Sequence, residues 1–342
     1  CILFMPQRGE PKFSADARWS GYRPNEAELT PNYMKLRFLK SRASFELTPT
    51  LRGAAVQTEY DDSEENWLSV LPLEGESSFE YIPEEKTLYC KVHNVNGDVS
   101  ADFTMYCIIR FEPSQIEDAE NIVGTDTQKH TGNYICAENA GIHLKVKGNR
   151  VCCKIASSYI SFEQAALNFD RELAGKSFDS LRTDGEKLWE DYLSRVQIET
   201  DSEKQMKTFY SCMYRAFLYP HRCYELNENG QPIHYAPGDG KTYPGVRYTD
   251  NGFWDTYRTC YPFYALVARE EYREMCEGFV NDYLEGGWLP RWPSIGERGC
   301  MPSTLIDAVL CDAAVKGIMT GKTLENAFEG MLFGLCLYSI LN

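Results

Sequence analysis

The side chains best suited to chemistry lie in two segments of the chain. Residues 248–262 read YTDNGFWDTYRTCYP and residues 278–292 read GFVNDYLEGGWLPRW. Both combine acids, amides and large aromatic rings beside turn glycines. Carbohydrate sites use this mixture, because aromatic faces cover the apolar face of a sugar ring while carboxylates and amides bond its hydroxyls. The alternative is a helix start, with Asp250 or Asn251 as N-cap and Trp254 in the core.

Glycosidic bonds are usually cleaved between two carboxyl groups, roughly 6.5–9.5 Å apart for inversion and roughly 5–5.5 Å apart for retention. The carboxylates beside turns and aromatic residues are Asp250, Asp255, Glu285, Glu297 and Asp312. From the residue types alone, Asp255 would be the base and Glu297 the acid. The sequence does not give the distances between them.

The composition is that of a globular protein. The 342 residues suffice for two domains, and 43% are hydrophobic and 25% charged. The net charge of −15 argues against nucleic acid or an anionic membrane as a partner, since both attract basic surfaces. No apolar run is long enough to predict a membrane span, and residues 331–341 predict a buried helix instead.

Cysteine usage bears on the cellular compartment. The chain has 13 cysteines, including the adjacent pair Cys152 and Cys153, which argues against a disulfide framework. Free thiols favour a cytoplasmic location. The chain begins at Cys1, within what looks like a strand, so we expect the natural N-terminus to be missing, and a secreted or periplasmic location stays open. The 5 histidines do not cluster and are predicted to be structural.

Residues 1–160 predict an antiparallel β-sandwich, because short runs rich in β-branched and aromatic residues alternate with turn residues. The predicted strands are Met34–Phe38, Ala43–Leu47, Trp67–Leu71, Thr87–Val92, Phe103–Phe111, Ile142–Val146 and Val151–Ser157. The polar stretch Glu112–Asn139 is predicted to be a long loop or insertion.

The hydrophobic period changes to that of a helix near Ser161. Residues 161–200 predict a helical linker, and residues 201–342 predict antiparallel helices after a possible hairpin at Asn227–Pro244. The helices expected there are Trp254–Ala268, Arg273–Glu285, Thr304–Met319 and Thr323–Leu341.

Several segments resemble glycoside hydrolase family 92, the calcium-dependent exo-acting α-mannosidases, chiefly α-1,2. They are FLKSRASFELTPT, VLPLEGESSFEY, SSYISFEQAALNFDREL, KTFYSCMYRAFLYPHRCYE, NGQPIHYAPGDGK, GFWDTYRT, FVNDYLEGGWLPRW and DAVLCDAAVKGI. The resemblance extends from about Ile2 to about Leu332 and keeps the family's order. It implies a multidomain β + α protein, in which an antiparallel β-sandwich precedes an (α/α)6 barrel. We expect the sandwich to be truncated at its N-terminal side and only the first helices of the barrel to be present.

The resemblance also implies roles for two residues. Trp254 would form an apolar wall of the subsite for a terminal mannose, and Asp255 would accept hydrogen bonds from sugar hydroxyls. Trp288, Arg291 and Trp292 are the next candidates for substrate binding. The structural alternatives are a cap for Asp255, core for Trp254 and a solvated charge for Arg291.

The resemblance places the general acid and base beyond Asn342, which overrules Asp255 and Glu297, so no catalytic residue is assigned. Calcium is implied as a cofactor. The oxygen donors Asp250, Asn251, Asn281 and Asp282 are not assigned as ligands, because the resemblance places the ligands mainly downstream.

The expected activity of the parent protein is inverting hydrolysis of terminal α-mannose from N-glycan or mannan-type oligosaccharides, with this chain an inactive fragment. The alternatives are a non-catalytic carbohydrate-binding module and a structural fragment without activity.

Overall fold

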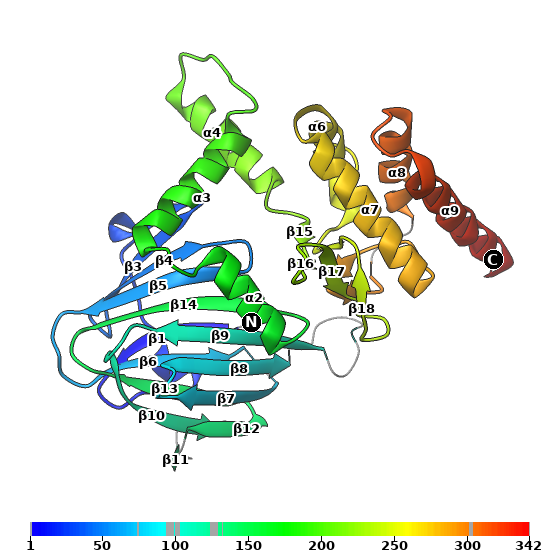
Figure 1. Ribbon diagram of the computed structural model, residues 1–342. Coiled ribbons are helices and arrows are strands. Elements are labelled where there is room, and N and C mark those ends of the chain that lie inside the picture. The colour runs from blue at the N-terminus through cyan, green and yellow to red at the C-terminus, as the bar shows by residue number, and fades with distance from the viewer. Residues whose placement is uncertain are drawn as a thin grey trace. The chain divides into compact units, whose positions relative to one another are not determined.

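The computed structural model describes residues 2–73, 75–93, 99, 103–123, 129–131, 133–300 and 304–341, with side chains except at 121–131 and 335–341. Contacts divide the chain into two compact units (Figure 1). The first holds the described residues of Cys1–Asn94 and Thr104–Glu190, and the second holds those of Val95–Phe103 and Asp191–Asn342.

Two antiparallel sheets form most of the first unit. The described residues give a five-stranded sheet, in the order β1-β6-β13-β10-β11, and a nine-stranded sheet, in the order β12-β7-β8-β9-β14-β5-β4-β3-β2. The strands are β1 (Ile2–Arg8), β2 (Glu28–Thr30), β3 (Tyr33–Phe38), β4 (Ala43–Pro49), β5 (Gly53–Tyr60), β6 (Asn66–Pro72), β7 (Glu76–Ile82), β8 (Thr87–His93), β9 (Thr104–Phe111), β10 (Ile116–Val123), β11 (Lys129–Thr131), β12 (Tyr134–Glu138), β13 (Ala140–Val146) and β14 (Arg150–Ser158).

One apolar cluster unites the two sheets. On β8, Leu88, Cys90 and Val92 are buried, so every second residue faces inward. They share a cluster with Leu68 of β6 and Ile142 of β13, which belong to the other sheet. The two sheets therefore pack face to face as a β-sandwich, and every strand expected from the sequence lies within an observed strand or overlaps one.

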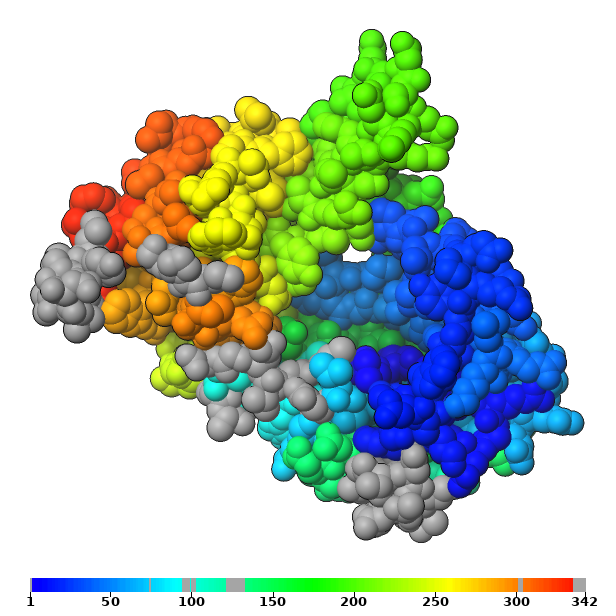
Figure 2. All heavy atoms as spheres, turned by 180° about the vertical axis from the view of Figure 1, so that it is seen from behind, coloured from blue at the N-terminus to red at the C-terminus, as the bar shows by residue number. Residues whose placement is uncertain are grey.

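Helices and a surface segment complete the first unit. They are α1 (Ala15–Arg18), η1 (Pro24–Glu26), α2 (Phe162–Glu172) and the first part of α3 (Phe178–Leu193). Ser161 caps α2, where its hydroxyl accepts the Gln164 N–H. Phe169 of α2 then packs with Ala156 of β14 in a small apolar cluster. The segment between β1 and β2, blue in Figure 2, lies on the surface of the unit.

The second unit is built mainly of helices, with short strands between them. The helices are α4 (Glu203–Ala216), α5 (Phe253–Thr256), α6 (Cys260–Val267), α7 (Arg269–Gly286), α8 (Leu305–Val315) and α9 (Gly321–Leu341). The strands are β15 (His221–Arg222), β16 (Glu225–Leu226), β17 (Pro232–Tyr235), β18 (Thr242–Pro244), β19 (Tyr248–Thr249), β20 (Pro293–Ser294) and β21 (Gly296–Glu297). Helix α7 contacts α6, α8 and α9. The apolar core of the second unit holds the buried rings of Tyr261, Tyr264, Tyr272 and Phe279. No helix in the described ranges is both long and apolar enough to cross a bilayer.

The prediction of a loop at Glu112–Asn139 is wrong. This stretch holds β10, β11 and β12, and β10 pairs with β13. The pairing shifts between Ile116 and Asp118, so a β-bulge interrupts the alternation of side chains. A polar strand whose alternation is interrupted does not show the period by which a strand is recognised in a sequence.

The predicted helix Trp254–Ala268 is two helices, α5 and α6. Pro262 explains the interruption, because in a continuous helix it would remove the hydrogen bond to the carbonyl of Arg258 and its ring would clash there. In α6, Pro262 lies in the first turn, where no N–H donor is needed. The N-cap of α5 is Gly252, not Asp250 or Asn251.

Candidate functional site

The two aromatic, acidic segments lie against each other in the second unit. The Asn251 N–H donates to the Pro293 carbonyl at 3.1 Å, and the Ile295 N–H donates to Thr249 Oγ1 at 2.7 Å. A Cβ at Gly252 would lie 2.3 Å from Cζ3 of Trp292, so the ring packs directly on a backbone that only glycine allows. The start of α5 and the loop after α7 therefore form one surface.

A buried arginine, Arg247, binds the loop that follows α7. Arg247 is 2% exposed, and its Nε donates to Asp282 Oδ1 at 2.8 Å. Another guanidinium nitrogen donates to the Ile295 carbonyl. Arg247 thus links α7, through Asp282, to the loop that carries Trp292.

Trp254 and Asp255 are exposed in the first turn of α5. The Trp254 side chain is 46% exposed, and the Arg258 guanidinium lies 5.9 Å from its ring centroid. The cap of α5, Gly252, makes no side-chain cap hydrogen bond, and Phe253 is the buried residue of this turn. Asp255 is therefore not the cap and Trp254 is not core, so both side chains are accessible to a ligand.

The other three predicted residues follow α7, whose C-cap residue, Gly287, is in the left-handed conformation (φ 80°). Trp288 is 56% exposed, and its ring centroid lies 5.3 Å from that of Phe333. Arg291 is exposed, with Nε 3.9 Å from Glu297 Oε1. Trp292 is half-buried against Gly252. The loop therefore presents Trp288 and Arg291 outward and uses most of Trp292 for packing.

Glu297 organises this loop rather than facing a substrate. Its carboxylate accepts the N–H groups of Arg291 at 2.8 Å, Trp292 at 3.2 Å and Gly299 at 3.2 Å. These bonds stabilise a charged acceptor that closes a turn. A general acid must donate a proton, so this environment gives no support to Glu297 as the acid.

The remaining carboxylates named from the sequence have cationic or polar partners. Glu285 Oε2 lies 2.9 Å from Nε2 of the buried His234, and Asp312 Oδ2 lies 2.7 Å from Lys316 Nζ. Burial raises the pKa of Asp282, against the opposing effect of Arg247. The ion pairs of Glu285, Asp312 and Asp282 therefore give these three carboxylates structural roles.

One arrangement was missed in the sequence. His221 Nδ1 lies 2.9 Å from Asp250 Oδ2, and Ser294 Oγ donates to Asp250 Oδ1 at 3.1 Å. His221 is distant in sequence from both partners, and no spacing rule connects them. The only local signal was Asp250 itself, an acid directly before the NGFWD turn.

The oxygen donors considered for calcium do not form a metal site here. Asn281 Nδ2 donates to the Val246 carbonyl at 2.8 Å, and Asp282 pairs with Arg247. Asp250 pairs with His221, and Asn251 Oδ1 lies 3.4 Å from Thr256 Oγ1. Calcium needs six to eight converging oxygens, and no group of three or more His, Cys, Asp or Glu in the described part of the chain could hold a metal.

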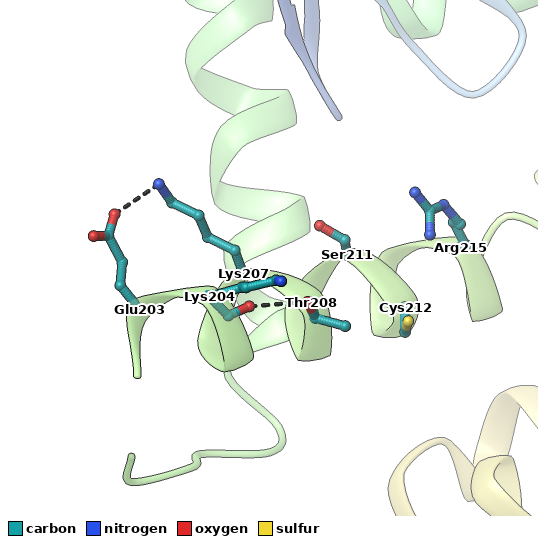
Figure 3. A pocket seen from close by; sticks show the side chains of 7 residues that line it. All are labelled: Glu203, Lys204, Lys207, Thr208, Ser211, Cys212 and Arg215. Atoms are coloured by element: carbon teal, nitrogen blue, oxygen red, sulfur yellow. Dashed lines mark hydrogen bonds and ion pairs between the residues drawn. The ribbon is translucent and has the colours of Figure 1, made fainter. Parts of the chain in front are cut away.

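A hollow lies elsewhere, along α4, with a volume of about 420 Å³ (Figure 3). Its lining residues are Glu203, Lys204, Lys207, Thr208, Ser211, Cys212 and Arg215. All seven come from one helix, so the hollow is walled on one side. Ligand sites enclose most of their ligand, and this surface does not.

Comparison with known proteins decides the family. Residues 164–334 match the glycosyl hydrolase family 92 catalytic domain, which is half of the chain. The chain belongs to glycosyl hydrolase family 92. The resemblance seen in the motifs is thereby confirmed.

Solved family 92 structures share the fold. A family GH92 inverting mannosidase from Bacteroides thetaiotaomicron VPI-5482 superimposes with a TM-score of 0.91 and 33% identity, over 97% of this chain and 45% of that one. A family GH92 α-mannosidase from Bacteroides thetaiotaomicron, solved with mannoimidazole, gives a TM-score of 0.85 and 23% identity, over 97% and 46%. The predicted fold class, a β-sandwich followed by the first helices of an (α/α)6 barrel, is confirmed.

A curated relative is an uncharacterized secreted glycosidase from Arthroderma benhamiae. It is 21% identical over 352 aligned residues, covering 94% of this chain and 40% of that protein. The family 92 chain described here therefore spans less than half the length of these relatives.

Proposed function

We propose that this chain is the part of an exo-acting family 92 α-mannosidase that carries the binding wall for a terminal mannose. The whole protein hydrolyses α-1,2-linked mannose of N-glycan or mannan-type oligosaccharides with inversion. The observation that carries the proposal is the exposed Trp254–Asp255 pair at the start of α5. The two solved relatives, an inverting mannosidase and an α-mannosidase, support it.

In this proposal the chain binds sugar and does not cleave it. The Asp255 carboxylate accepts hydrogen bonds from two neighbouring hydroxyls, and the Trp254 ring covers the apolar face beside them. Trp288 and Arg291 extend the same surface, while Trp292 holds it in place through Gly252. The general acid and base, and the ligands of a calcium ion, lie outside the described residues.

The test compares two polypeptides. We expect the whole protein to hydrolyse α-1,2-mannobiose and to release mannose first as the β-anomer, which proton NMR during early turnover resolves. We expect the 342-residue chain alone to show no turnover above a blank. Release of the α-anomer, or no mannoside hydrolysis by the whole protein, would refute the proposal. Binding of mannosides without turnover by the whole protein would favour a carbohydrate-binding module.

Metal removal tests whether calcium, which the activity of the whole protein should require, also binds to this chain. EDTA should abolish activity of the whole protein, and calcium should restore it. The melting temperature of the 342-residue chain should change by less than about 1 °C on addition of calcium or EDTA, because a ligand stabilises a fold only by binding it. A calcium-dependent rise of several degrees would show that ligands lie in this chain after all.

A further inference from the structure

His221 is an exposed histidine held in one orientation by three contacts. It lies on β15, directly opposite Thr249 of β19. Its Nδ1 lies 2.9 Å from Asp250 Oδ2, and its ring centroid lies 4.7 Å from that of Tyr219. The imidazole nevertheless remains 53% exposed. A surface side chain is usually mobile, so this degree of fixation on an accessible ring needs a reason.

The contacts determine the tautomer. A carboxylate only accepts hydrogen bonds, so the proton between His221 and Asp250 is on Nδ1. Ser294 Oγ occupies the other carboxylate oxygen at 3.1 Å, which prevents Asp250 from rotating away. Nε2 is therefore the nitrogen left for another partner on this exposed side chain, and it has no hydrogen-bond partner within the described ranges.

Stability alone gives a weak reason for this arrangement. An ion pair with a half-exposed member contributes little to folding. Asp250 also adopts a left-handed backbone conformation, with φ of 59°, which is unfavourable for residues with a side chain, although less so for Asp and Asn than for others. Strain of this kind gathers at binding and active sites, where a side chain must be aimed.

The His221–Asp250 pair is bonded to the same two loops that carry the proposed mannose wall. Asp250 lies four residues before Trp254 in one loop, and Ser294 lies two residues after Trp292 in the facing loop. Both loops are tied together by the Asn251–Pro293 hydrogen bond of 3.1 Å. Because the His221–Asp250 pair is bonded to both loops, it keeps its position relative to the proposed mannose wall.

We propose that His221 is a substrate-contacting residue, whose Nε2 forms a hydrogen bond with a hydroxyl of the bound α-mannoside, and that Asp250 is its positioning residue. A hydroxyl both donates and accepts, so it can bond the imidazole in either protonation state. This inference rests on the proposed mannosidase function and adds a sugar contact to the same site.

Two amide substitutions in the whole protein separate sugar binding from a purely structural tether. His221→Gln places an amide group near the position of Nε2, and His221→Asn places one near Nδ1. If Nε2 contacts the sugar, His221→Asn and His221→Ala should lower kcat/KM for α-1,2-mannobiose by about 10-fold or more. His221→Gln should recover most of that loss. The Ki of mannoimidazole should follow the same order.

The opposite order, with activity kept by His221→Asn and lost in His221→Gln, would show that only the tether to Asp250 matters. Near-normal kinetics for all three variants would also overturn the inference. Asp250→Asn, whose amide tolerates the left-handed backbone, should lower kcat/KM several-fold, and no change would remove its positioning role.

The matched control is His93→Gln, which alters another histidine beside a carboxylate, with Nε2 3.8 Å from Glu76 Oε1 in the first unit. It should leave kcat/KM unchanged. An inactive wild-type protein would refute the proposed function, whereas an active wild type with active His221 variants refutes this inference alone.

Discussion

Asp255→Ala in the whole protein should lower kcat/KM for α-1,2-mannobiose by about 10-fold to 100-fold. The reason is that sugar hydroxyls buried against the site would lose a charged acceptor, which costs about 1–3 kcal/mol or more. Asp255 is exposed in the first turn of α5 beside Trp254 and does not cap the helix. Steady-state kinetics would show the loss in kcat as well as KM if the contact strengthens in the transition state.

The control for this prediction is Asp239→Ala. Asp239 accepts hydrogen bonds from Lys241 Nζ at 2.9 Å and Tyr243 Oη at 2.8 Å in the hairpin between β17 and β18. It should leave kcat/KM unchanged. Melting curves of both variants exclude a folding defect. Equal activity of two folded variants would mean that Asp255 does not contact the substrate.

The second large effect concerns stability. Arg247→Met should destabilise the helical unit by about 3–5 kcal/mol, because it leaves the carboxylate of Asp282 buried without its cation. Asp282 Oδ2 is already buried without a hydrogen-bond partner among the described residues. Urea unfolding followed by far-UV circular dichroism measures the change. The control Arg273→Met, which breaks an exposed pair with Glu270 on the same helix, should stay within about 0.5 kcal/mol.

The pH dependence has a definite sign. Burial raises the pKa of Asp282 in the folded protein, and loss of Arg247 raises it further. A raised folded pKa means that stability is greatest below the unfolded value of about 3.9 and is lost as pH rises through the folded value. The destabilisation by Arg247→Met should therefore be smaller near pH 4 than at pH 7. The double variant Arg247→Met/Asp282→Leu should recover much of the loss, and no recovery would contradict the uncompensated charge as its cause.

The fold was largely predictable because its signals are local. Regular alternation in β8 and the helical period of α7 identify a strand and a helix within a few residues of their bounds. β10 was missed because its bulge interrupts the alternation. The break between α5 and α6 had a visible cause, Pro262, which the hydrophobic pattern concealed.

The site was predictable only where one segment carries the information. Trp254 and Asp255 are adjacent in sequence, and the structure places both at an accessible helix start. Their role in binding mannose stays a prediction, as do those of Trp288, Arg291 and Trp292. The His221–Asp250 contact joins β15 to the residue that follows β19 through tertiary packing, so no spacing in the sequence could reveal it.

The close approach of Gly252 to Trp292 limits how this surface can be re-engineered. A Cβ at residue 252 would lie 2.3 Å from the Trp292 indole. The loop before α5 and the loop after α7 therefore cannot be exchanged separately without a steric clash or a cavity. The Arg247 and Ser294 bonds add two further ties between them. A chimera that borrows specificity from another family 92 enzyme must therefore transplant residues 247–256 and 288–297 together, as one cassette.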